Sequence, residues 1–146
     1  MGNFQAYLAV LSLAMCLPAI ADAQIPLAAT KHQRLLVGTA RQEFGMNAPI
    51  PLFAAQVHQE SSWNCAAESP YAQGCAQFTP ETAEWASMRW DDLRPALVFN
   101  PGWALRAMMR YDRFLLDRVD FAKECDSWAA ALAAYNGGLT LSLIHI

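Results

Sequence analysis

One acidic residue of this chain stands where an acid can do chemistry. Phe53, Val57 and Glu60 stand at positions i, i+4 and i+7, and at about 100° per residue they fall on one stripe of a helix. Glu60 therefore continues an apolar face, whereas His58 and Gln59 point elsewhere. A carboxyl at the edge of a core is desolvated, and desolvation raises its pKa. A glutamic acid with a raised pKa is what a general acid needs near neutral pH.

A second stripe ends in a phenol. Trp128, Leu132 and Tyr135 have the same spacing of i, i+4 and i+7, and a buried tyrosine hydroxyl needs a hydrogen-bond partner. If the two stripes share one core, Tyr135 and Glu60 can meet. The plainer alternatives are that Glu60 is a solvated charge at a helix end and that Tyr135 only packs. The spacing alone does not decide between these interpretations.

Helices must position these residues, and the sequence predicts an all-α domain because no stretch shows convincing period-2 alternation. The first two expected helices cover 30–44 and 51 to about 61 or 63, and Thr79-Pro80 opens a short third helix. A long amphipathic helix follows over 101–119, and a last helix is capped by Asp126 or Ser127 and ended by Gly137-Gly138. A loop over 64–79 and an irregular stretch over 88–100 connect these helices.

Both ends of the chain are expected to lie outside this domain. An apolar run followed by Ala21-Asp22-Ala23 is typical of a secretory signal peptide over 1–23. The alternative is a membrane anchor, but the run is shorter than the roughly 20 residues that span a bilayer. Residues 141–146 match the translation of a sequencing-library adapter. We therefore expect the domain over 24–140 and a natural sequence that continues beyond Thr140.

The composition fits one compact domain and excludes some partners. Of the 146 residues, 55% are hydrophobic and 16% are charged, which argues against disorder. The formal net charge of −3 becomes −2 once Asp22 leaves with the signal peptide. We expect no nucleic-acid partner, because such a partner normally needs a basic face. We also expect no metal site, because the cysteines and His58 lack the spacing of a ligand cluster.

Two sequence blocks carry a resemblance to a known family. The first block, Gln59 to Ala83, contains Glu-Ser-x-aromatic at 60–63, Ala-x-Ser-Pro at 67–70, Gly74, and Gln-x-x-Pro-x-Thr-Ala at 77–83. The second block reads Ala-Tyr-Asn-Gly-Gly at 134–138. In this order, the blocks resemble the SLT-type lytic transglycosylases, goose-lysozyme-like enzymes that cleave peptidoglycan. The resemblance covers about residues 48–138.

The resemblance implies a lysozyme-like fold and a role for each matching residue. Glu60 matches the single catalytic acid and base, and Ser61 matches a hydroxyl that orients it or touches the sugar. Gln77 matches an amide that contacts substrate. Tyr135 matches the phenol that hydrogen-bonds the catalytic glutamate, and Asn136 matches a neighbouring glycan contact. No cofactor is implied, and we expect a monomer in the periplasm or cell envelope.

The chain departs from the common family pattern in three places. The loop between Ser69 and Gln77 is one residue shorter than usual, as in some phage-like members. Cys75 stands where leucine is usual, and Ala76 where methionine or alanine is found. The family's helices after the Tyr-Asn block are missing, so we expect a C-terminally truncated copy.

The resemblance also implies a reaction that needs one carboxylate. Most glycosidases use two carboxylates. In this chain Glu68, Glu81 and Glu84 are candidates for the second one only because they are acidic, and no pattern singles any of them out. In lytic transglycosylases, the C6 hydroxyl of N-acetylmuramic acid attacks its own anomeric carbon. This breaks the β-1,4 bond to N-acetylglucosamine and leaves a 1,6-anhydro end. The alternatives are a hydrolytic muramidase and a non-catalytic peptidoglycan-binding module of an envelope or phage machine.

Cysteines and aromatic residues close to Glu60 suggest how the site is built. Cys65 and Cys75 flank the loop, and a disulfide between them would brace it. With Cys125 the mature chain has an odd number of cysteines, so the pairing stays open.

The aromatic residues near Glu60 are candidates to line a sugar groove, although Trp85 and Trp90 fit a core equally well. These aromatic residues are Trp63, Tyr71, Phe78, Trp85 and Trp90.

Overall fold

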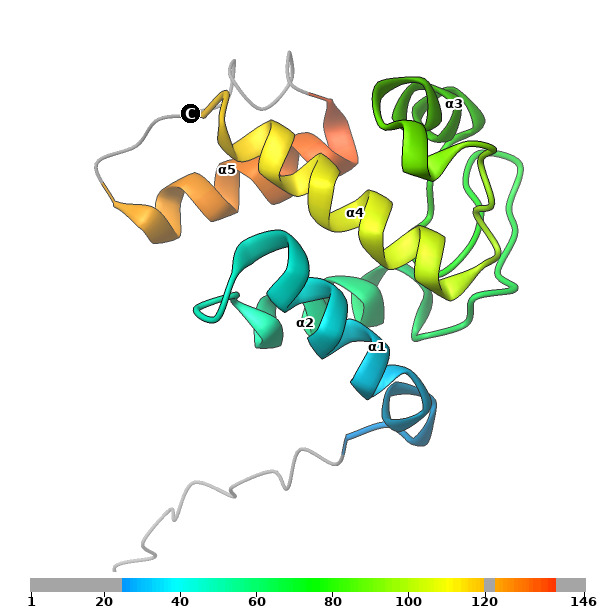
Figure 1. Cartoon of the computed structure of the whole chain (residues 1–146), viewed down its shortest axis with the longest axis horizontal. Helices are drawn as coiled ribbons and strands as arrows, with labels where there is room; N and C mark the ends of the chain where they lie inside the picture. The colour runs from blue at the N-terminus through cyan, green and yellow to red at the C-terminus, as the bar shows by residue number, and fades with distance from the viewer. Residues whose placement is uncertain (1–24, 120–122, 139–146) are drawn as a thin grey trace, which may run out of the picture.

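The structure, a computed structural model, describes residues 25–119 and 123–138, and every regular element within them is helical (Figure 1). The elements are α1 (Leu27–Phe44), α2 (Ile50–Ser61), α3 (Pro80–Arg89), the 3-10 turn η1 (Asp91–Leu93), α4 (Pro101–Leu116) and α5 (Glu124–Gly137). The prediction of an all-α domain is confirmed. The predicted signal peptide and the six terminal residues lie outside the described residues. Within those residues, no helix is both long and apolar enough to cross a membrane.

Helix α4 is the centre of the fold. It packs against α1, α3 and α5, and α2 packs on α1 (Figure 1). The buried side of α4 includes Leu105, Met108 and Met109, which are almost completely shielded from solvent. Asn100 starts this helix, because its side-chain oxygen accepts hydrogen bonds from the first free backbone N–H groups. α4 therefore supplies the wall on which the other helices are arranged.

Aromatic packing joins the ends of three helices. The ring of Phe53 in α2 lies 5.0 Å from that of Phe44 in α1 and 5.7 Å from that of Trp128 in α5. Phe53 is fully buried, and edge and tilted contacts of this kind add to the burial of the rings. This cluster fixes α2, whose last turn contains the candidate acid, against α1 and α5.

The buried face of α5 differs from the predicted stripe. Trp128, Leu132 and Tyr135 are only half-buried, and the fully buried residues of this helix are Ala130, Ala131 and Ala134. Alanines face α4 because their small side chains let the two helices approach closely. The larger residues lie at the margins of this contact.

Some helix ends also differ from the prediction. α1 begins at Leu27 rather than Thr30, because the carbonyl of Pro26 already accepts a helical hydrogen bond. α4 ends at Leu116, short of the predicted Val119.

Neither Asp126 nor Ser127 caps α5. Their backbone N–H groups both donate to the carbonyl of Lys123, so the two residues lie inside the first helical turn. An oxygen-bearing side chain is a common cap but not a required one, which is why the sequence placed this boundary too late.

Candidate active site

Glu60 lies at the C-terminal end of α2, at the edge of the core. Phe53 and Val57, which precede it on the same stripe, are fully buried, and Glu60 itself is half-buried. His58 and Gln59 are exposed. Burial raises the pKa of the Glu60 carboxyl above its ordinary value. The predicted position of Glu60 on the buried stripe is confirmed.

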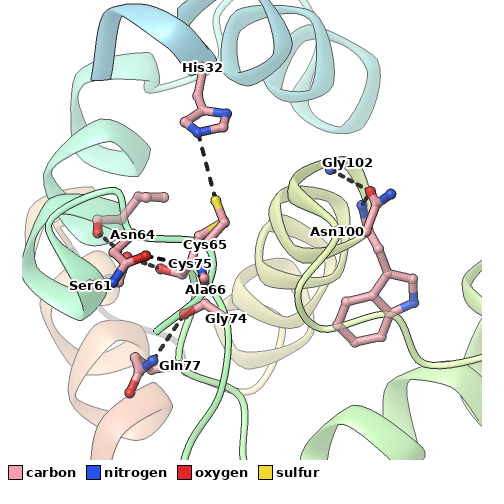
Figure 2. The surroundings of a disulfide bond; sticks show 12 residues. His32, Ser61, Asn64, Cys65, Ala66, Gly74, Cys75, Gln77, Asn100 and Gly102 are labelled. Carbon is pink, nitrogen blue, oxygen red and sulfur yellow. Dashed lines mark hydrogen bonds between the residues drawn. A yellow bond between two sulfur atoms is a disulfide. The ribbon is translucent and has the colours of Figure 1, made fainter. Parts of the chain in front are cut away.

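The loop that follows, residues 62–79 and hereafter the site loop, is tied back to α2. Cys65 and Cys75 form a disulfide, so the brace that the sequence suggested is present. The hydroxyl of Ser61 donates to the carbonyl of Cys75 at 2.8 Å (Figure 2). Ser61 thus holds the loop beside Glu60, since its proton is used on this carbonyl.

Gln77 occupies a tight turn of the site loop. Its backbone has a φ of 48°, in the left-handed region, and its side-chain Nε2 donates to the carbonyl of Gly74 at 2.9 Å (Figure 2). Gly74 has a φ of 78°, and a Cβ there would overlap the backbone of Val98. The turn therefore requires glycine, and it presents the half-buried amide of Gln77 next to the loop's disulfide.

Tyr135 reaches the same loop from α5, although not in the expected way. Its hydroxyl donates to the carbonyl of Ala76 at 2.7 Å, whereas the resemblance implied a hydrogen bond to Glu60. Burial raises the pKa of Tyr135 well above its ordinary value, and the charges of Asp112 and Glu60 raise this pKa further. The phenol therefore lies within the electric field of Glu60, but its proton fixes the site loop.

Asn136 lies next to Tyr135 on the exposed side of α5. Its side-chain Nδ2 donates to the carbonyl of Leu132, one turn earlier, at 3.1 Å. The two sequence blocks thus meet in space: Ser61 and Tyr135 bind successive carbonyls of the site loop, those of Cys75 and Ala76.

The region that contains both sequence blocks matches the model of a known family. The family model of the transglycosylase SLT domain matches residues 36–142. The chain belongs to the transglycosylase SLT domain family. No curated protein sequence matches it. SLT domains act on peptidoglycan with transglycosylase or lysozyme-like activity.

A second carboxylate of this SLT domain, that of Asp112, was not predicted from the sequence. Asp112 in α4 is fully buried, and Nε2 of Gln56 donates to its Oδ1 at 3.1 Å. Burial and, secondarily, the charge of Glu60 raise the pKa of Asp112 to about 7, against the opposing hydrogen bond from Gln56. The signal was present in the sequence, since Asp112 follows Leu105 by seven residues and Met108 by four on the apolar stripe of α4.

The other three glutamates that the sequence offers as a second carboxylate lie away from the core. Glu68, Glu81 and Glu84 are all exposed, and Glu68 accepts a hydrogen bond from Gln73 within the site loop. None of the three has the desolvated surroundings of Glu60. Asp112 is the carboxyl whose pKa the charge of Glu60 raises.

The aromatic candidates for a sugar groove divide into core and surface residues. Trp63 and Phe78 are buried and belong to the hydrophobic core of the SLT domain. Trp85 and Trp90 are half-buried and pack edge to face at 5.4 Å. Tyr71 is 80% exposed, so of these five rings it is the one most open to a ligand.

A surface hollow of about 620 Å³ begins two residues after Glu60. Its lining includes Ser62, Asn64 and Cys65 of the site loop, together with Lys31 and His32 of α1. Nε2 of His32 lies 3.8 Å from the sulfur of Cys65 (Figure 2). Glu60 does not line this hollow itself.

Proposed function

We propose that this SLT domain is an exported lytic transglycosylase and that Glu60 is its catalytic acid and base. The observation that carries the proposal is the half-buried carboxyl of Glu60, whose pKa burial raises. A proton on such a carboxyl is retained closer to neutral pH and is available to a leaving oxygen. The family match supplies peptidoglycan as the substrate.

The reaction needs this one carboxyl. Glu60 gives its proton to the glycosidic oxygen between N-acetylmuramic acid and N-acetylglucosamine as the C–O bond breaks. The resulting carboxylate then takes the proton from the C6 hydroxyl of the muramic acid as that oxygen closes the 1,6-anhydro ring. The fully buried Asp112 cannot contact a sugar, so it cannot serve as the nucleophile or base of a two-carboxylate hydrolase.

The neighbouring residues have two kinds of role in this proposal. Ser61 and Tyr135 hold the site loop, since their protons are used on its carbonyls. Gln77 and Asn136 contact the glycan, for which each has an amide oxygen that accepts no hydrogen bond within the described residues. Positioned donors and acceptors of this kind orient a sugar chain relative to the acid.

The test is Glu60→Gln, with Glu84→Gln as the matched control at an exposed carboxylate. Each purified variant is incubated with peptidoglycan, and the soluble muropeptides are identified by mass spectrometry. We expect 1,6-anhydro ends from wild type and from Glu84→Gln, and a rate at least about 10²-fold lower for Glu60→Gln. Normal turnover by Glu60→Gln removes Glu60 from the mechanism.

The same experiment separates the alternatives. Reducing ends in place of anhydro ends indicate a hydrolytic muramidase. Binding to peptidoglycan without soluble products from wild type indicates a binding module. Export is tested on the secreted protein, whose N-terminus we expect at Gln24, after the Ala21-Asp22-Ala23 sequence.

A further inference from the structure

A buried pair of polar side chains links α2, the helix that contains Glu60, to the central helix α4. Asp112 of α4 is fully buried and Gln56 of α2 is 6% exposed. One hydrogen bond joins them, from Nε2 of Gln56 to Oδ1 of Asp112. The other oxygen of each side chain, Oε1 of Gln56 and Oδ2 of Asp112, is buried and has no partner in the described part of the chain.

An ionised Asp112 does not fit these surroundings. An isolated buried carboxylate is costly unless a cation or several donors compensate it. Within residues 25–119 and 123–138, the ion pairs involve other acids, and Gln56 is the single donor to Asp112. The titratable groups whose charges couple to Asp112 are Glu60 of α2, Tyr135 of α5 and Tyr111 of α4. All three are neutral or negative, so none of them compensates a negative charge.

We propose that Asp112 is a neutral carboxylic acid that forms two hydrogen bonds with Gln56, and that this acid–amide pair positions Glu60. A proton on Oδ2 supplies the missing donor, and Oε1 of Gln56 is the missing acceptor. The two bonds together close a ring between the side chains and satisfy both buried oxygens. With a pKa of about 7, Asp112 keeps this proton in acidic solution and loses it progressively as the pH rises through neutrality.

The pair acts on Glu60 through α2, the helix that contains both Gln56 and Glu60. Gln56 and Glu60 are one turn apart on α2, so a bond that fixes Gln56 against α4 also fixes the rotation of α2 about its axis. A neutral Asp112 has a second effect, because an ionised one would oppose the negative charge that Glu60 acquires when it gives up its proton. This part of the proposal rests on the proposed function of Glu60.

Three variants separate positioning from stability. Asp112→Asn keeps a neutral group with a donor and an acceptor. At pH 5.5 we therefore expect its Tm to stay within a few degrees of wild type and its kcat within about twofold. Asp112→Leu leaves Gln56 without a partner, and we expect a lower Tm and a kcat reduced at least about tenfold. The double variant Gln56→Leu/Asp112→Leu removes both polar groups, so its Tm should recover while its kcat stays low.

Several outcomes of this comparison overturn the proposal. An equal loss of kcat in Asp112→Asn and Asp112→Leu shows that the neutral pair is not what matters. A kcat that recovers with Tm in the double variant shows a structural role alone.

The protonation state has its own readout, which needs no activity. A carboxyl whose folded pKa exceeds its unfolded pKa makes the folded protein bind more protons between the two values, so stability is lost as pH rises through that window. We expect the Tm of wild type to fall between about pH 4 and pH 7 more steeply than that of Asp112→Asn. Equal slopes show that Asp112 is ionised in the fold. If wild type cleaves no glycan, the proposed function and the positioning role fail together, and the slopes still decide whether the pair is neutral.

Discussion

Tyr135→Phe tests whether the last helix is tied to the site loop by a single hydrogen bond. The substitution removes the hydroxyl that donates to the carbonyl of Ala76 at 2.7 Å. The ring remains, and with it the contacts to Phe78 and Tyr111, whose centroids lie 6.0 Å and 5.4 Å away. The change is therefore confined to one donor.

The expected magnitude follows from the burial of the acceptor. Ala76 is fully buried, so in Tyr135→Phe its carbonyl loses this partner without gaining water. Leaving a buried acceptor unsatisfied costs about 1–3 kcal/mol. Tyr111→Phe is the matched control, since burial and the charge of Asp112, and no hydrogen bond within the described residues, act on the Tyr111 hydroxyl. We expect its effect to stay within about 0.5 kcal/mol.

Urea unfolding at pH 6, followed by tryptophan fluorescence, measures both variants. The midpoint should shift for Tyr135→Phe at an unchanged slope, and hardly at all for Tyr111→Phe. A pH profile of glycan cleavage adds a second readout. If the phenol serves the loop, Tyr135→Phe lowers kcat without moving the pH at which Glu60 loses its proton. Equal stability of the two variants, or a shifted profile, would refute the reasoning.

Further predictions concern the site loop and its surroundings. Gly74→Ala should destabilise the fold by about 1–3 kcal/mol or more, because the new Cβ overlaps the Val98 backbone at a positive φ. Gly38→Ala, in the middle of α1 with open space around it, should stabilise by about 0.5–1 kcal/mol. Equal urea midpoints for the two variants would contradict these opposite effects. Reduction of the Cys65–Cys75 disulfide should cost about 2–3 kcal/mol, measured as a lower Tm in the presence of a reductant; an unchanged Tm would mean that the site loop is held without it.

The helices and the position of the acid could be predicted because they depend on local periodicity. The stripe of Phe53, Val57 and Glu60 needed only the 3.6-residue repeat, and Thr79 and Pro80 marked the start of α3 through ordinary capping chemistry. Signals of this kind lie within a few residues of the feature that they determine, so a single sequence contains them.

The hydrogen-bond partners could not be predicted in the same way. Tyr135 and Ala76 are 59 residues apart, and Gln56 and Asp112 are 56 apart. The choice of Ala76 rather than Glu60 for the phenol depends on how α5 approaches the site loop, which no local pattern encodes. The apolar stripe of α4 indicates that Asp112 is buried, but it does not indicate that Gln56 is its partner.

The ties on the site loop differ greatly in the length of chain that they close. The disulfide spans ten positions and the Ser61 hydrogen bond spans 14, whereas the Tyr135 hydrogen bond spans 59. Short closures cost less entropy and need no distant partner. The site loop can therefore take its shape from residues that are close to it in the sequence. The hydrogen bond from Tyr135 is different in kind, because it forms only after α5 has packed against the site loop.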